Sequence, residues 1–560
     1  MSARRVSPAE WRWVAVAALL LMFLTTVPYV VGMLNETPEM TFGGFLFGLD
    51  DMHSYLAKMR YGARDGWLFH LVYTHEPHRG GVVFVFHLAL GKLAAWVTGE
   101  GALVSARALV FTYHAARVVF GLLLLAVLYR FVAEYLEKPS RRRLAWTVAA
   151  LMGGLGWVLL LIASLTGLDL SAAFDLGANA FATTPLELYV PEAFTLLLLY
   201  GLPHLALARS LLLIGWLVFF RSLDADDWRR ALLAGLAWLG MGVIVPFYAA
   251  LLGVLIATWL AGLLVLRRRL PGAELRLAAL AGAFPLAILL YNVWLFSGDP
   301  VFAAWSAQNQ LASPPLLDYL LAYGLWIGLG GVGLAGLLRR GLTRRTVLLV
   351  SWPLAVALMV YLPVNVQRRL LEGVIVPLSV LATLGAWRLV GEKRPGFGWR
   401  LRWLALAGLI GLSLPSVVLL LGGGVLTASE PRWPVFHPAD ELAALDWLRG
   451  HAPPESVVLS TFESGNVIPA YAGVRVYVGH GPETVNSGQK RILAERFFQG
   501  EMSDSERRAL LEEAGVAYVW VGPLERGEGC AGTGCFDPAR LGLREVFSQG
   551  RYIIYEVPRP

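Results

Sequence analysis

The chain has 560 residues, of which 57% are hydrophobic and 16% are charged, and it contains 20 Trp. Soluble globular proteins of this length do not reach such an apolar content, so that class is excluded and the bilayer must be the main solvent. The net charge of +7 does not indicate a nucleic-acid partner, because the basic residues lie mostly in short loops between apolar runs, where they orient helices.

Eleven apolar runs are long enough to span a bilayer. They lie near residues 12–34, 103–133, 145–166, 196–220, 231–246, 247–266, 273–296, 317–338, 346–362, 372–390 and 403–426. The first run follows basic residues as a signal peptide would, but it lacks a small-residue cleavage site, so we interpret it as a retained helix. Pro246 is expected to form the turn between the fifth and sixth runs.

Positive charge is concentrated in alternate connections between these runs. Those connections hold Arg141 to Arg143, Arg229 and Arg230, Arg267 to Arg269, Arg339 and Arg340 with Arg344 and Arg345, and Lys393 and Arg394 with Arg400 and Arg402. The intervening segments 167–192 and 297–316 contain no Lys or Arg. The positive-inside rule therefore predicts a multi-pass protein of the cell (inner or plasma) membrane with a cytoplasmic N-terminus and an extracytoplasmic C-terminus.

The first outer loop, roughly 35–102, carries two adjacent carboxylates, Asp50 and Asp51. Each acid raises the pKa of the other unless a cation shares the site, so the pair is suited to act as a base or to hold a divalent ion. A helix is predicted from Met52 to Arg64, lying on the bilayer with one apolar face, and the pair would stand at its N-terminus. The alternative is that the acids only cap a surface helix.

Farther along this loop, Thr74-His75-Glu76-Pro77-His78 gathers several titratable groups in a turn. Glu76 and His78 can contribute to a metal site, but the helical spacing of an HExxH motif is absent, so polar substrate contacts are favoured over a metal. A solvated turn is the alternative without function.

Several polar residues lie at or within the apolar runs. Arg368 and Arg369, flanked by Gln367, interrupt the orientation pattern on the outer side, where guanidinium groups can bind a lipid phosphate. The alternative, interfacial anchoring by snorkelling arginine side chains, explains this position less well. Arg117, within the second run, needs a partner, either a lipid phosphate or a neighbouring helix. Glu192 and His204 flank the outer end of the fourth run and either bind a sugar or phosphate or satisfy each other.

The tail, 430–560, is predicted to be a small extracytoplasmic α/β domain, and 1–429 the membrane domain. Helices are expected at 440–448 and 504–514, the second with a capping box of Ser503 and Glu506, and strands at 457–460, 474–478, 516–521 and 552–557. Cys530 and Cys535 cannot form a metal site alone, and outside the cell they favour a small disulfide loop.

The pattern of one helix, an acidic pair opening a large outer loop, many further helices and an outer domain resembles the GT-C-type glycosyltransferases. Asp50-Asp51-Met52-His53 is similar to the Asp-Glu-x-His opening of protein mannosyltransferases and to the Asp-Glu pairs of bacterial lipid-sugar transferases, although the second acid here is Asp. The resemblance implies a polytopic α-helical fold and a cell-envelope hexosyltransferase that takes sugar from a polyprenyl-phosphate-linked donor.

In such an enzyme a carboxylate deprotonates an acceptor hydroxyl, which attacks the anomeric carbon with inversion while the lipid phosphate departs. The resemblance implies Asp50 or Asp51 as the base and Arg368 with Arg369 as donor-phosphate contacts. Arg117 is a further phosphate candidate from its place within an apolar run. Some relatives use a divalent cation such as Mg²⁺ or Mn²⁺, for which Asp50, Asp51, Glu76 and His78 are the candidates. The acceptor is a lipid, a glycan or a protein. Candidate substrate contacts are His53, Tyr55, Lys58, Glu76, His78, Glu192, His204, Gln367, His480 and Glu483.

Two other functions fit the same sequence. A lipid-linked glycan flippase or transporter would also have many helices with intramembrane Arg and His, but no paired repeat of broken segments is evident. A non-catalytic assembly or sensor protein would leave the acids of the first loop dispensable.

Overall fold

A computed structural model describes residues 5–64, 66–167, 184–390, 399–526 and 536–558. The predicted cysteine pair, Cys530 and Cys535, lies outside the described residues. The chain folds into two compact units, each assembled from segments that are distant in the sequence. Unit 1 comprises Met1–Thr26, Ala116–Asn292 and Leu311–Gly423, and unit 2 comprises Val27–Ala115, Val293–Gln310 and Gly424–Pro560. The domain boundary between residues 429 and 430 was predicted from the change in composition there, and it stays a prediction.

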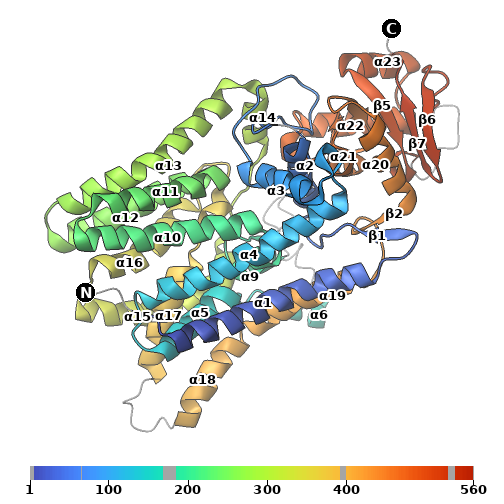
Figure 1. The fold of residues 1–560 in the computed structure, drawn as a ribbon. Helices are drawn as coiled ribbons and strands as arrows, with labels where there is room; N and C mark the ends of the chain where they lie inside the picture. The colour runs from blue at the N-terminus through green and yellow to red at the C-terminus, as the bar shows by residue number, and fades with distance from the viewer. Residues whose placement is uncertain (1–4, 65, 168–183, 391–398, 527–535, 559–560) are drawn as a thin grey trace. The chain divides into compact units, whose positions relative to one another are not determined.

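Helices occupy all the predicted apolar runs (Figure 1). They are α1 (Pro8–Leu34), α4 (Ala106–Ala133), α5 (Pro139–Leu151), α6 (Trp157–Thr166), α9 (Thr195–Gly201), α10 (Pro203–Ala225), α11 (Trp228–Ile244), α12 (Phe247–Arg267), α13 (Gly272–Gly298), α15 (Leu316–Arg340), α16 (Arg344–Met359), α17 (Ile375–Val390), α18 (Trp399–Gly411) and α19 (Leu414–Ala428). The short helix α8 (Leu186–Tyr189) lies between two of the runs. The turn expected at Pro246 is confirmed, because α11 ends and α12 begins on either side of it.

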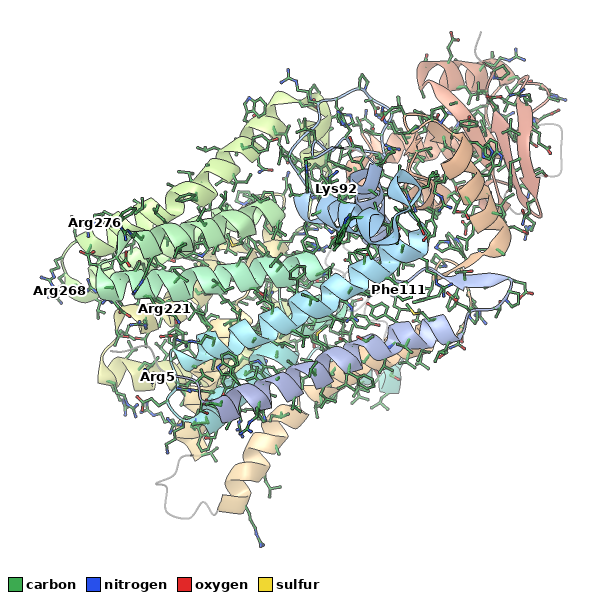
Figure 2. The ribbon with its side chains drawn as sticks, viewed as in Figure 1. Arg5, Lys92, Phe111, Arg221, Arg268 and Arg276 are labelled. Carbon is green, nitrogen blue, oxygen red and sulfur yellow. The ribbon has the colours of Figure 1, made fainter. Side chains whose placement is uncertain are left out.

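Seven helical segments of the described chain are long and apolar enough to cross a membrane, which supports a polytopic α-helical membrane protein. The other four predicted runs form helices that are interrupted or shorter than 18 residues. The total of about eleven spans therefore stays a prediction. Figure 2 shows Arg5, Arg221, Arg268 and Arg276 at the same end of the unit 1 helices. Arg268 belongs to a predicted basic loop, and the orientation in the membrane stays a prediction.

Close packing of apolar and small residues builds the core of unit 1. Trp216, Trp238 and Trp259, from α10, α11 and α12, are fully buried, and the ring of Trp216 lies 5.4 Å and 5.9 Å from the other two. A Cβ atom at Gly333 of α15 would stand 2.1 Å from the carbonyl oxygen of Leu381 in α17. Small residues that allow such close backbone approach are typical of membrane helix packing.

The loop at 35–102 folds against the tail within unit 2. It contributes β1 (Met40–Phe42), α2 (Leu49–Arg64), α3 (Val85–Thr98) and the short η1 (Gly101–Leu103), and α14 (Pro300–Gln308) also belongs to this unit. Strand β1 pairs antiparallel with β2 (Phe436–Pro438) at the start of the tail. Helix α2 packs against α3 and against α21 (Phe462–Ala472) of the tail.

The predicted interfacial character of this helix is wrong. The apolar face with Leu56 and Met59 is buried, as expected, but so are Ser54, Lys58 and Arg60 on other faces. Protein surrounds α2, and the polar side chains are accommodated because partners from the tail satisfy them.

The tail is an α/β fold, as predicted. Its five-stranded sheet has the order β4-β3-β5-β7-β6, in which β3 is parallel to β4 and β5, and β7 is antiparallel to β5 and β6. The capping box predicted for Ser503 and Glu506 is present at the start of α23. The elements are α20 (Ala439–His451), β3 (Val457–Leu459), α21, β4 (Arg475–Val476), η3 (Gly481–Glu483), α22 (Ser487–Gln499), α23 (Asp504–Glu513), β5 (Val516–Val521), α24 (Pro523–Arg526), β6 (Arg544–Gln549) and β7 (Tyr552–Glu556). Strand β6 and helices α21 and α22 were not predicted.

Candidate functional site

Asp50 and Asp51 stand in the first turn of α2. The helix starts after Gly48, whose φ of 54° is in the left-handed region, and the Met52 amide donates to the Gly48 carbonyl at 3.0 Å. Carboxylates are favoured at this end because unpaired amide groups give a helix N-terminus partial positive charge. Both acids are exposed to solvent, so both are accessible to a substrate.

Asp51 is the first of four side chains of alternating charge, which extend from the surface into the interior of unit 2. His480 Nε2 lies 3.2 Å from Asp51 Oδ1, and its Nδ1 lies 3.4 Å from Glu483 Oε1. Glu483 Oε1 in turn accepts from Lys58 Nζ at 2.6 Å and from Ser54 Oγ at 2.8 Å. The structure thus brings together Asp51, Lys58, His480 and Glu483, which the sequence predicted as site residues separately.

The charges of these four side chains shift the pKa of the inner members. Burial alone would lower the pKa of His480, but Asp51 and Glu483 outweigh it and raise the pKa to about 9. Burial would raise the pKa of Glu483, but the Lys58 charge and His480 lower it to about 2. Near neutral pH His480 is therefore an imidazolium and Glu483 a carboxylate, and each stabilises the charge of the other.

Asp50 has a different environment from Asp51. The surrounding protein raises the pKa of Asp50 by desolvation, His480 opposes the shift, and the charge of Asp51 adds to it. Asp50 therefore has a raised pKa and stands beside an acid that already contacts His480.

The loop from His480 to Thr484 is anchored to other parts of unit 2. The Thr484 hydroxyl donates to the Tyr73 carbonyl at 2.7 Å and accepts from the Gly479 amide at 3.2 Å. Gln308 of α14 donates to the Thr484 carbonyl at 2.8 Å. This anchoring holds the loop at the end of α2, so two other segments of the chain, at Tyr73 and Gln308, fix the position of His480.

Asn466 of α21 was not predicted as a site residue. It is buried, and neither its Nδ2 nor its Oδ1 makes a hydrogen bond with the part of the chain that the structure describes. Its amide is close enough to Asp50 to favour the charged form of that acid and so to lower its pKa. No local pattern marks this residue, because only the packing of α21 against α2 brings it near the acidic pair.

His53 and Tyr55, predicted as substrate contacts, pack inside unit 2. The His53 ring is buried 5.7 Å from that of His437, and burial is the main cause that lowers its pKa to about 3. The Tyr55 ring stacks on His87 of α3 at 4.5 Å. Both residues hold α2 in place, and their substrate role stays a prediction.

Glu76 and His78 bind protein groups in the structure. Glu76 Oε1 lies 2.7 Å from Lys490 Nζ, while His78 Nε2 accepts from the Leu71 amide at 2.8 Å and His78 Nδ1 lies 2.8 Å from the Glu76 carbonyl. Both imidazole nitrogens are therefore used. Within the described ranges no group of three or more His, Cys, Asp or Glu is placed to hold a metal ion, so Asp50, Asp51, Glu76 and His78 do not form the predicted shared metal site.

Arg368 and Arg369 lie in the short 3-10 helix η2 (Gln367–Leu371) of unit 1. Arg369 Nε is 3.6 Å from Glu192 Oε1, and the Arg368 guanidinium lies 5.6 Å from the Tyr189 ring centroid. Gln367 accepts from the Ser313 amide at 3.0 Å and donates to the Leu362 carbonyl at 2.7 Å, so it fixes the turn.

A buried ion pair holds the segment that carries Arg368 and Arg369 in place. Nε and Nη2 of Arg209 in α10 donate to the two carboxylate oxygens of Glu372, which follows η2, and Tyr248 also donates to that carboxylate. Arg209 and Glu372 are fully buried, and Arg209 also donates to the Glu192 carbonyl at 2.9 Å. Arg209 was missed, although a charge within an apolar run is the signal that marks such a residue.

Arg117 forms hydrogen bonds between helices, which was the predicted alternative to phosphate binding. It donates to Thr25 at 3.0 Å, to Thr26 at 2.7 Å and to the Leu199 carbonyl at 3.2 Å. Its guanidinium is buried among these partners, which leaves it poorly placed for a lipid phosphate. His204 is buried in the first turn of α10.

No protein-family model matches the sequence, and neither does any curated protein. Solved structures do match. The apo form of the Archaeoglobus fulgidus oligosaccharyltransferase aligns with a TM-score of 0.51 and 14% identity over 91% of this chain and 69% of that one. The same enzyme tethered with an acceptor peptide containing the NVT sequon gives a TM-score of 0.50, 14% identity and the same coverage.

ArnT from Cupriavidus metallidurans in the apo state is also similar, with a TM-score of 0.47 and 13% identity over 97% of this chain and 98% of that one. At 14% identity, the two oligosaccharyltransferase alignments establish a likeness of fold alone. The chain therefore shares its fold with an oligosaccharyltransferase, and the resemblance predicted from the sequence is confirmed at that level.

Proposed function

We propose, from the GT-C-type fold of this chain, that it is a membrane glycosyltransferase that moves a sugar from a polyprenyl-phosphate-linked donor to an extracytoplasmic acceptor. The structural neighbour solved with an acceptor peptide supports a protein acceptor. The acidic pair at the start of α2 is proposed to provide the general base. The observation that carries the proposal is that Asp51 contacts His480, whereas Asp50 has a raised pKa.

Asp50 is the proposed general base. A base is most effective when its pKa lies near the working pH, and the pKa of Asp50 is raised while its carboxylate remains exposed to solvent. Asp51 contacts His480 and is the proposed positioning acid. Asp50 accepts the acceptor proton as the acceptor oxygen bonds to the anomeric carbon, and the bond from that carbon to the phosphate oxygen breaks with its electron pair leaving on phosphate.

Arg368 and Arg369 are the proposed contacts of the departing phosphate, because guanidinium groups form paired hydrogen bonds with phosphate oxygens. Glu192 orients Arg369, and the Arg209 to Glu372 pair holds the turn that carries both arginines. Glu192, His204 and Gln367 are proposed to line or support this donor site.

A divalent cation does not fit the acidic pair as unit 2 presents it. Beside Asp50 and Asp51 stand the imidazolium of His480 and, beyond Glu483, the ammonium of Lys58. These cations already compensate the carboxylate charge, and a protonated imidazole has no lone pair for a metal. We therefore derive no step that requires a metal.

The test uses purified protein in proteoliposomes, a panel of radiolabelled polyprenyl-phosphate-hexoses, and membrane extract as the source of acceptor. Asp50→Asn should reduce labelled product and released polyprenyl phosphate by about 10²- to 10⁴-fold, the usual contribution of a general base. Asp51→Asn should cause a smaller loss, because it removes a partner of the base. Glu39→Gln, which neutralises an exposed acid of the same loop, is the matched control and should retain activity.

Unchanged transfer by both Asn variants would sink the enzymatic proposal. A protein that moves labelled lipid across the bilayer without releasing polyprenyl phosphate would be a flippase. Arg368→Gln with Arg369→Gln should raise the donor concentration needed for half-maximal rate, and an unchanged donor dependence would remove their assigned role.

A further inference from the structure

Unit 2 contains a cavity of about 200 Å³ that the proposed transfer reaction does not use. Its lining comes from the C-terminal end of α1, from β1 and the glycines after it, from the first turns of α4, from α20 and from the end of α21. All of these segments belong to unit 2. At ~30 Å³ per water molecule, the cavity has room for about seven waters, which suits a small polar headgroup.

One wall of the cavity holds a buried histidine with an unused nitrogen. His437 is 1% exposed, and its Nδ1 lies 2.9 Å from Glu441 Oε2. A carboxylate can only accept, so Nδ1 donates, and in the neutral ring Nε2 is an acceptor. Nε2 has no hydrogen-bond partner among the described residues, and it lies on the side of Gly43, which also lines the cavity.

Both signs of charge stand at the cavity. Arg107 lies 3.0 Å from Glu36, and Arg449 lies 3.1 Å from Asp446. These four side chains line the cavity, and each arginine has further N–H groups beyond those used in its pair. The cavity therefore offers donors for a phosphate and, at His437 Nε2, an acceptor for an N–H or O–H group.

The cavity also lies where two candidate membrane spans end. Met33 is in the last turn of α1, and Arg107 and Phe111 are in the first turns of α4. Phe111 is 52% exposed, and Figure 2 shows it on α4. Arginines at the end of a membrane helix are typical of the headgroup level of a bilayer, and Phe111 adds exposed apolar surface beside them.

We infer that this cavity binds the headgroup of a phospholipid that carries an N–H or O–H donor. Arg107 and Arg449 contact the phosphate, His437 Nε2 accepts from the ammonium or hydroxyl group, and the acyl chains follow the apolar surface beside Phe111. The inference is independent of the proposed transfer reaction. It predicts a preference that depends on the headgroup donor and not on the chains.

The experiment measures lipid retention by the full-length protein in detergent, using native mass spectrometry. Phosphatidylethanolamine and phosphatidylglycerol supply a donor, and phosphatidylcholine with the same chains supplies none. The first two should half-saturate the site at about tenfold lower concentration than phosphatidylcholine, the effect of one net hydrogen bond. Glycerophosphoethanolamine, which lacks the chains, should bind more weakly than the intact lipid.

Variants assign the effect to the cavity. His437→Phe combined with Glu441→Leu removes the buried pair together, so that no charge is left unpaired, and should abolish the preference over phosphatidylcholine. Arg107→Ala should weaken all three lipids. Arg276→Ala is the matched control, because Arg276 is also an exposed arginine paired with a carboxylate, Asp226, and it should bind as wild type does.

Ala106→Trp, which fills the cavity, keeps the inference testable if the double variant fails to fold. It should eliminate the retained lipid while the melting temperature of the protein without added lipid stays near the wild-type value. Equal retention of phosphatidylcholine by the wild type, or wild-type preference in the filled variant, overturns the inference.

Discussion

At the scale of single residues, the contact between Asp51 and His480 makes the site depend on pH. His480 has a pKa of about 9 in the folded protein, against 6.5 for an unperturbed histidine. A raised pKa stabilises the folded state fully below about pH 6.5, and the contribution is lost as pH rises to about 9. Thermal unfolding in detergent should therefore show lower stability at about pH 10 than at about pH 6, by no more than ~3 kcal/mol.

The variant His480→Gln isolates this effect. It keeps a polar side chain at the same place but does not titrate, so the alkaline loss of stability should disappear while the loss at strongly acidic pH remains. That acidic loss comes from Glu483, whose lowered pKa of about 2 stabilises the fold above its usual value of 4.5. An unchanged alkaline slope in the variant would show that other groups cause it.

The residues of the site could be predicted one by one, but their pairing could not. Asp50, Asp51, His480 and Glu483 stand out as polar groups in outer segments of an apolar chain. The contact of His480 with Asp51 joins residues 429 positions apart, and no periodicity encodes that distance. Asn466 was missed because only helix packing brings it to the site, whereas Arg209 was missed although its charge within an apolar run marks it.

At the scale of elements, the crossing of α2 and α3 should be sensitive to a single methyl group. A Cβ atom at Gly91 would lie 1.7 Å from the Met59 carbonyl, so Gly91→Ala must displace α2, which carries the acidic pair. We expect ~1–3 kcal/mol of destabilisation, the usual effect of overpacking. Chemical denaturation followed by tryptophan fluorescence would measure it.

Gly488 provides the comparison for this substitution. It lies in α22 of the same unit, and a Cβ atom there would meet nothing within 4 Å. Gly488→Ala should be neutral or stabilising by ~1 kcal/mol, because alanine favours helix more than glycine does. Equal destabilisation by both substitutions would contradict the role of close backbone approach.

The helices and strands that could be predicted are those whose own sequence has a clear local pattern. The apolar runs gave helices near the expected limits, and the capped helix α23 and the strands β5 and β7 were found because their patterns are local. Helix α2 was expected on the bilayer because its apolar face is evident and its buried Lys58 and Arg60 have distant partners. Strand β6 has a mostly exposed, polar pattern, so its sequence does not alternate as a strand with one buried face would.

At the scale of the whole molecule, the charged loops predict an orientation that can be measured. In a background with Cys530→Ser and Cys535→Ser, single cysteines would replace Arg268, at the end of α12, and Glu545, exposed on β6. An impermeant maleimide should label position 545 in intact cells and label position 268 only after permeabilisation, because basic loops are retained in the cytoplasm. The reverse pattern would contradict the proposed topology.

The tail residue His480 has a further consequence for how the protein is made. The ribosome completes most of the membrane helices before it reaches residue 480, so the nascent chain already contains the acidic pair but lacks the imidazolium beside it. Glu483, which pairs with Lys58 of α2, arrives at the same late stage. A product truncated before residue 480 would therefore insert in the membrane with an unfinished site, and the proposed transfer would require that synthesis be nearly complete.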